Sequence, residues 1–240
     1  MHARKLLLLT TIAVAATPFT AAVARAAPIL SASQSCYTVG ESVGIAGLGF
    51  ASIQAYEVDI NSQFFGISTT DALGSFSASL RPGGLRANVV QSIDTLTASD
   101  GMNTSKTTFT VTRAAGARIL AGTGKAATLR APFQIWGFQH MPNPAPLNTG
   151  PPLQYPVPVP SVPVPTRRRV YVHYLGPHKR LKMTIKLGRV GGQCGYLRTG
   201  PRRVFPFVPS RGTWTLQVDS KRHYVRHPAG PVTRIRVRVT

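Results

Sequence analysis

Between Arg167 and Asp219 the chain places an apolar residue at every second position, and this alternation constrains the fold more than any other feature. It runs through three segments, at Val170, Val172 and Tyr174, at Leu181, Met183, Ile185 and Leu187, and at Trp214, Leu216 and Val218. Successive side chains of a strand point to opposite faces, whereas a helix repeats every three or four residues. The region is therefore predicted to be a β-sheet with one packed face and one face in water.

The residues between these apolar positions are polar and mostly positive, among them Lys182, Thr184 and Lys186. Tyr171 and His173 occupy the same alternate positions, so we expect both to be partly exposed. At the end of the chain, Ile235, Val237 and Val239 alternate with Arg234, Arg236 and Arg238. An antiparallel sheet with one wet face accounts for this pattern.

From Ile29 to Arg113, short β-prone segments alternate with turn residues at spacings typical of a β-sandwich. The length of the chain allows two such domains, each with its own core. The predicted fold is all-β, with two tandem sandwich domains at 28–113 and 114–240, and Arg113 to Gly124 as the link between them.

Four sequence motifs follow one another in the first domain, GxGF at 47–50, DxxGSFSA at 71–78, DTLTASDG at 94–101 and TFTVT at 108–112. In this order they resemble the motifs of the bacterial Ig-like modules of exported surface proteins. The resemblance implies a hairpin turn in which Asp71 caps its own backbone and Gly74 takes a positive φ. We expect the aromatic and apolar residues Phe50, Phe76, Leu96 and Phe109 in the core. A calcium loop is rejected, because a single carboxylate falls far short of the oxygen ligands that calcium requires.

The second domain repeats one element of the first, since APFQIWGF at 131–138 echoes VGIAGLGF at 43–50. This echo favours a tandem of similar sandwiches, with Trp136 and Trp214 as paired core aromatics. The segments VYVHYLGP, LGRVGGQCG, FPF and GTWTLQVD resemble a C-terminal module of secreted, actinobacterial-type proteins with no assigned activity. That resemblance implies an Ig-like module and no catalytic residue.

A proline-rich stretch at 141–166 interrupts the second domain. It contains ten prolines in 26 residues, and proline cannot donate the backbone hydrogen bonds of a strand. We predict an exposed polyproline-like insertion, and we favour a spacer or tolerated loop over a ligand for a proline-recognising partner.

Residues 1–27 have the pattern of a secretory signal peptide. Basic residues come first, an apolar run follows from Leu6, and small residues precede a cleavage position near Ala26 or Ala27. No later segment is long and apolar enough to span a bilayer. We therefore expect a secreted protein, extracellular or associated with the cell envelope, with no transmembrane segment after cleavage.

Cys36 and Cys194 are the two cysteines of the chain. In an exported protein they could pair and join the two domains or two chains, and two isolated thiols are the preferred interpretation. The loop GGQCG, with His178 sixteen residues before Cys194, is similar in spacing to exported L,D-transpeptidases. The flanking Gln193 and Gly195 depart from the pattern of those enzymes.

No catalytic residue, cofactor or metal is predicted. Asp219 is the only acid after residue 113, which nearly excludes acid–base chemistry by paired carboxylates. Among the histidines, His223 and His227 form the best-spaced pair, and no cysteine or carboxylate supports it as a metal site. We therefore expect a protein that is not an enzyme.

Positive charge is concentrated in the second domain. Residues 31–113 hold six acids and four Lys or Arg, a net charge of −2, whereas residues 114–240 hold 21 Lys or Arg and one acid, a net charge of +20. Such a field attracts polyanions and weakens with salt, although arginine on a solvated sheet face is the simpler explanation. The hypothesis is a non-catalytic surface protein that binds anionic envelope polymers or acidic surfaces and no specific nucleic acid. The alternatives are a purely structural spacer in a larger assembly and a Cys-dependent transpeptidase-like enzyme. The candidate polyanion-binding residues are Lys182, Lys186, Arg189, Arg198, Arg202, Arg203, Arg234, Arg236 and Arg238.

Overall fold

A computed structural model describes residues 27–125, 128–139 and 167–240. The predicted signal peptide, apart from Ala27, and the proline-rich insertion lie outside these residues. The described chain is all-β, with 17 strands and no helix, as the alternation predicted. It accordingly offers no helix that could cross a membrane.

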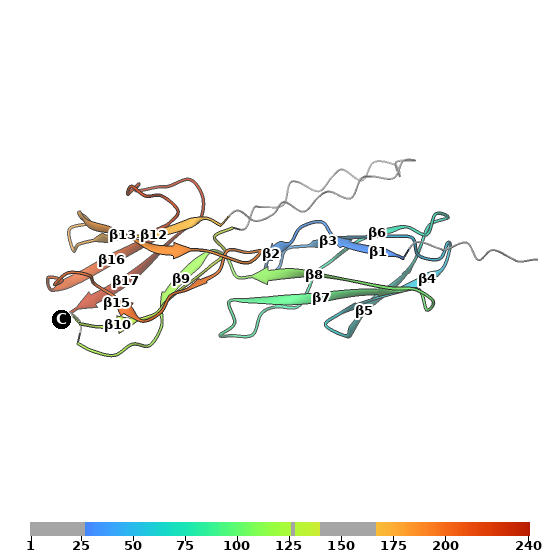
Figure 1. The fold of residues 1–240 in the computed structure, drawn as a ribbon, viewed down its shortest axis with the longest axis horizontal. Coiled ribbons are helices and arrows are strands. Elements are labelled where there is room, and N and C mark those ends of the chain that lie inside the picture. The colour runs from blue at the N-terminus through green and yellow to red at the C-terminus, as the bar shows by residue number, and fades with distance from the viewer. Residues whose placement is uncertain (1–26, 126–127, 140–166) are drawn as a thin grey trace, which may run out of the picture.

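The first half of the chain, residues 28–113, contains two sheets (Figure 1). One sheet has the order β1-β3-β6 and the other the order β2-β8-β7-β4-β5, in which β2 runs parallel to β8. The strands are β1 (Ile29–Ala32), β2 (Cys36–Thr38), β3 (Val43–Leu48), β4 (Ala55–Ile60), β5 (Gln63–Thr69), β6 (Phe76–Leu80), β7 (Gln91–Ser99) and β8 (Thr104–Thr112).

One apolar cluster fills the space between these two sheets. It includes Ile45 and Phe76 from the first sheet and Leu96 and Phe109 from the second, and it also takes in Phe50. These contacts confirm the four core residues predicted from the motifs, since Phe50, Phe76, Leu96 and Phe109 are all buried.

The turn before β6 has the predicted Asp71 cap and positive-φ glycine, but it is not a hairpin turn, because it joins β5 to β6 and these strands belong to different sheets. The carboxylate of Asp71 accepts hydrogen bonds from the backbone N–H groups of Leu73 and Ser75, both at 2.8 Å. Gly74 has a φ of 71°, and a Cβ there would lie 2.0 Å from the carbonyl oxygen of Phe50. Only glycine fits a left-handed position that is so close to a neighbouring backbone.

The second half, residues 114–240, contains three sheets around a second apolar cluster. Their orders are β13-β12-β16-β17, β14-β11-β9 and β10-β15. The strands are β9 (Gly116–Ile119), β10 (Arg130–Ala131), β11 (Phe133–Trp136), β12 (Arg169–Leu175), β13 (Leu181–Arg189), β14 (Leu197–Arg198), β15 (Arg202–Arg203), β16 (Gly212–Asp219) and β17 (Val232–Val239). In Figure 1 this half lies at one end of the molecule and β1 to β8 lie at the other.

Two expectations about the second half are wrong. The presumed link at 113–124 contains β9, which pairs with β11. Trp214 is buried against Phe205 and Phe207 and forms no ring pair with Trp136, whose indole packs over Gly116 instead. The segment 204–207 follows the short strand β15 as irregular chain that buries Val204 and Phe205.

A disulfide joins the two halves. The sulfur atoms of Cys36, in β2, and Cys194, in the loop after β13, are bonded across a sequence separation of 158 residues. The preference for two isolated thiols is therefore corrected. Spacing could not reveal this pair, because its proximity depends on how the end of one half meets the end of the other.

Candidate anion-binding face

The four-stranded sheet of the second half brings together six of the nine candidate polyanion-binding residues. Cross-strand partners in a sheet project from the same face, and the register pairs Tyr171 with Lys186, and Gln217 with Arg234. The outward face therefore carries cations on both edge strands. Lys182, Lys186 and Arg189 come from β13, and Arg234, Arg236 and Arg238 come from β17, all six exposed.

The other three candidates lie on different sheets. Arg198 belongs to β14, and Arg202 and Arg203 belong to β15. Arg202 is half-buried, and its guanidinium donates to the carbonyl oxygen of Leu187 at 3.3 Å. The structure therefore separates the nine residues into one group on the four-stranded sheet and one group elsewhere.

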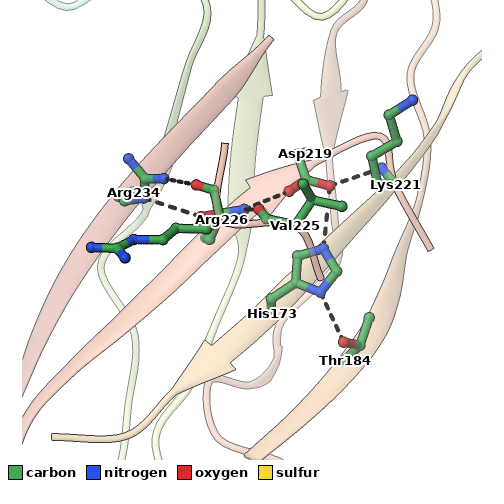
Figure 2. Close-up of polar contacts among 8 residues, drawn as sticks. His173, Thr184, Asp219, Lys221, Val225, Arg226 and Arg234 are labelled. Atoms are coloured by element: carbon green, nitrogen blue, oxygen red, sulfur yellow. Dashed lines mark hydrogen bonds and ion pairs between the residues drawn. The ribbon is translucent and has the colours of Figure 1, made fainter. Parts of the chain in front are cut away.

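A buried polar network lies on the same face of the sheet, between the two cationic edges (Figure 2). His173 is fully buried, with Nδ1 at 2.8 Å from the hydroxyl of Thr184 and Nε2 at 3.2 Å from a carboxylate oxygen of Asp219. Gln217 donates to the other carboxylate oxygen at 2.9 Å. The expectation that His173 is partly exposed is therefore wrong.

The loop at 220–231, between β16 and β17, is what covers this part of the face. Gln217 donates to the carbonyl oxygen of Val225 at 2.8 Å, and the backbone N–H of Lys221 donates to Asp219 at 2.8 Å. Arg234 donates from Nε to Gln217 and from its terminal nitrogen to the carbonyl oxygen of Arg226 (Figure 2). The alternation of β16 predicted a wet face here, and it could not show that the chain folds back over it.

Hydrogen bonding keeps the carboxyl of Asp219 ionised. Burial by itself raises the pKa of this carboxyl, but hydrogen bonds from His173, Gln217 and the Lys221 N–H outweigh burial and hold the pKa below its usual range. Electrostatic attraction to His173 lowers the pKa of Asp219 further. The negative charge of Asp219 therefore interacts with groups inside the protein, and its hydrogen bonds hold the loop at 220–231 in place.

A surface cavity of about 480 Å³ opens beside this network. Its floor comes from β12 and β13, and its wall comes from the loop at 220–231. The lining residues are Arg169, Tyr171, Thr184, Lys186, Arg222 and His223. The sequence analysis named Lys186 as a polyanion-binding residue and did not assign the other five to this role. The loop that supplies Arg222 and His223 has no strand pattern that would place it.

The polar residues at this site have the types found in a hydrolase relay, namely a hydroxyl, a histidine and a carboxylate. In this network His173 is fully buried and its ring packs edge-on against Tyr224, with the centroids 5.7 Å apart, while Thr184 lines the cavity. The network thereby supports the floor of the cavity.

Cys194 is fully buried in its loop and bonded to Cys36. A disulfide sulfur is not a thiolate, and the thiolate is the form of cysteine that acts as a nucleophile. Among the described residues, no group of three or more His, Cys, Asp or Glu is arranged to hold a metal ion.

Comparison with known proteins gives no family assignment. No family model and no curated protein matches the sequence. Among solved structures, Salmonella alpha-2-macroglobulin reacted with methylamine is similar over 89% of this chain and 14% of its own, with 12% identity and a TM-score of 0.30. Parabacteroides merdae beta-glucuronidase is similar over 88% of this chain and 25% of its own, with 8% identity and a TM-score of 0.26. The chain thus spans a minor part of either protein.

Proposed function

We propose that the chain is a secreted, non-catalytic surface protein built from two tandem Ig-like sandwiches, whose second half binds anionic envelope polymers. The first half, slightly acidic, serves as a spacer or adhesive module. The proposal is supported by the sequence motifs of the first half, by the export-type leader and by the charge asymmetry between the halves.

The single observation that carries the binding role is the lack of exposed negative charge on the second half. Its one acid, Asp219, is 1% exposed. The cations on β13 and β17 therefore have no exposed acidic side chain of this half to neutralise them. A polymer with regularly spaced negative groups would gain Coulomb attraction along the whole face, and it would release counterions as it bound.

Salt-dependent retention tests this role. The mature protein is passed over immobilised heparin, or purified anionic wall polymer, and eluted with rising NaCl. Elution clearly above 0.15 M, where the Debye length is about 8 Å, is expected. Elution at or below that concentration overturns the proposal and leaves the chain as a structural spacer.

A matched pair of charge variants tests where binding occurs. Lys182→Gln, Arg236→Gln and Arg238→Gln together remove three charges from the face and should lower the elution salt markedly. Arg234 stays in place because it hydrogen-bonds Gln217. The control, Arg81→Gln, Arg86→Gln and Lys106→Gln, removes the same charge from exposed positions of the first half and should elute nearly as the unmodified protein. Equal shifts in both variants would show that only net charge matters.

A further inference from the structure

The cavity beside the buried network allows a more specific proposal about ligand chemistry than the anion-binding face as a whole does. Three of its six lining residues, Arg169, Lys186 and Arg222, are cationic at neutral pH, and His223 adds an imidazole. No carboxylate lines the cavity. Side chains of one sign gathered around one space repel each other, and an anion placed among them removes that repulsion.

The chemistry of the donors points to an oxyanion with several acceptor atoms. Guanidinium groups present paired N–H donors that match the oxygens of phosphate, and the ammonium of Lys186 acts as a compact point charge. Tyr171 and Thr184 add hydroxyls on the strand side of the cavity. A lone carboxylate offers two oxygens, whereas a phosphate group can satisfy donors from both the sheet and the loop.

The loop side of the cavity is fixed in place before any ligand arrives. Arg222 and His223 lie between two anchored points, because Lys221 donates its N–H to Asp219 and Val225 accepts from Gln217. The opposite side is equally fixed, since Thr184 is hydrogen-bonded to the buried His173. These hydrogen bonds fix the backbone that carries the cavity's side chains, so less conformational entropy is lost when an anion binds, and this raises affinity.

We propose that this cavity is a binding site for the phosphate groups of an anionic polymer, with Arg169, Lys186 and Arg222 as the charged ligands. This inference rests on the proposed function and deepens it, because it names the chemical group that one part of the face recognises. The remaining cations along β17 then contribute attraction without recognising a particular group.

The test measures binding of inorganic phosphate to the mature protein by calorimetry at pH 7 in 0.15 M NaCl. Lys186→Gln and Arg222→Gln should each weaken phosphate binding by roughly tenfold or more, the usual effect of losing one charge-assisted hydrogen bond. The matched control is Arg211→Gln, which removes one exposed charge from the same half and lies outside the candidate polyanion-binding residues. Arg211 directly precedes Gly212, the first residue of β16, whereas Tyr171 in the cavity pairs with Asp219, seven residues after Gly212 and about 23 Å away.

Phosphate affinity that falls equally in Arg222→Gln and Arg211→Gln, or in neither, overturns the site. Poly(glycerol phosphate) and free phosphate serve as separate arms. Competition between them at the cavity supports recognition of the polymer's phosphate groups, whereas a site that takes only the free ion contradicts the assignment to a polymer. Heparin retention of the same variants is measured in parallel. If the unmodified protein binds heparin but shows no phosphate binding at the cavity, this inference alone is wrong. If the unmodified protein does not bind heparin, the proposed function is wrong.

Discussion

At the scale of single residues, two buried tyrosines differ in how their hydroxyls are satisfied. The hydroxyl of Tyr174 is buried between the sheets of the second half and finds no hydrogen-bond partner among the described residues. The Tyr37 hydroxyl in the first half accepts from the Gln34 N–H at 2.7 Å and lies 3.1 Å from the Ser33 hydroxyl. Burial raises the pKa of both phenols.

We predict opposite effects when each hydroxyl is removed. Tyr174→Phe should leave stability unchanged or raise it by about 1 kcal/mol, because it removes a buried polar group that has no partner. Tyr37→Phe should lower stability by about 1 to 2 kcal/mol, because it leaves a backbone donor unsatisfied. Urea unfolding of the two variants measures both effects. A clear loss in Tyr174→Phe would mean that this hydroxyl has a partner after all.

The carboxyl of Asp219 should contribute to acid sensitivity. Its pKa is lower in the folded protein than its ordinary value of 3.8, so the folded state binds this proton less tightly than the unfolded chain does. The stabilisation is therefore complete above about pH 4 to 5 and is lost as the pH falls through the folded pKa. Asp219→Asn should be less stable at pH 6 and should lose less stability between pH 5 and pH 2.5.

Thermal unfolding followed across that pH range checks this prediction. Asp100→Asn is the matched variant in the first half, because hydrogen bonds from Ala51, Met102 and Asn103 outweigh burial and lower the pKa of the Asp100 carboxyl as well. Each variant should lose less stability than the unmodified protein as the pH falls. If Asp219→Asn loses stability as steeply as the unmodified protein, the role given to this carboxyl is wrong.

At the scale of elements, Gln217 is the residue that fastens the loop at 220–231. Replacing it by alanine removes the donors to Asp219 and Val225 and the acceptor for Arg234. The loop carries exposed trypsin sites at Lys221, Arg222 and Arg226.

We predict that Gln217→Ala accelerates tryptic cleavage in this loop several-fold, because local opening no longer has to break those hydrogen bonds. Thr215→Ala, two residues earlier on the same face of β16, is the control and should be cut at the original rate. Mass spectrometry of the fragments locates the cuts. Equal protection of the loop in both variants would contradict the role given to Gln217.

Sequence periodicity predicted the long strands well, but it did not predict which parts of each sheet face are covered by neighbouring segments. Strands β3 to β8 lie in the predicted strand region at 29–113, and β12, β13, β16 and β17 lie in those predicted at 167–219 and at the end of the chain. Burial alternates along β3, β4, β7 and β17, whereas β5 is exposed at every position except Gly66. Leu181 and Met183 continue that alternation in β13 and are nevertheless 46% and 39% exposed. Alternation reports which face a residue takes, and it does not report how far the neighbouring layer extends.

The candidate site was predictable only in part for the same reason. The charges of β13 and β17 follow from strand parity, and register places them on one face. Arg169, Arg222 and His223 join the cavity through a β-bulge near Val170 and through the loop at 220–231. Neither has a periodic signature, so their convergence appears only in three dimensions.

At the scale of the whole molecule, the disulfide between Cys36 and Cys194 sets how the two halves unfold. Chain-entropy arguments give a stabilisation of about 5 kcal/mol as an upper figure for closing a loop of this length. We predict that Cys36→Ser with Cys194→Ser lowers the unfolding temperature and separates one calorimetric transition into two. Non-reducing peptide mapping should recover the two cysteines in one linked fragment. Two unlinked peptides from oxidised protein would refute the bond.

The same bond imposes an order of events on biogenesis. Cys36 leaves the ribosome 158 residues ahead of its partner, so the thiol must stay reduced while nearly all of the intervening chain is made. Oxidation can occur only after the GGQCG loop has reached its place beside β2. Formation of the bond therefore marks the docking of the GGQCG loop beside β2, and until then both cysteines remain free thiols.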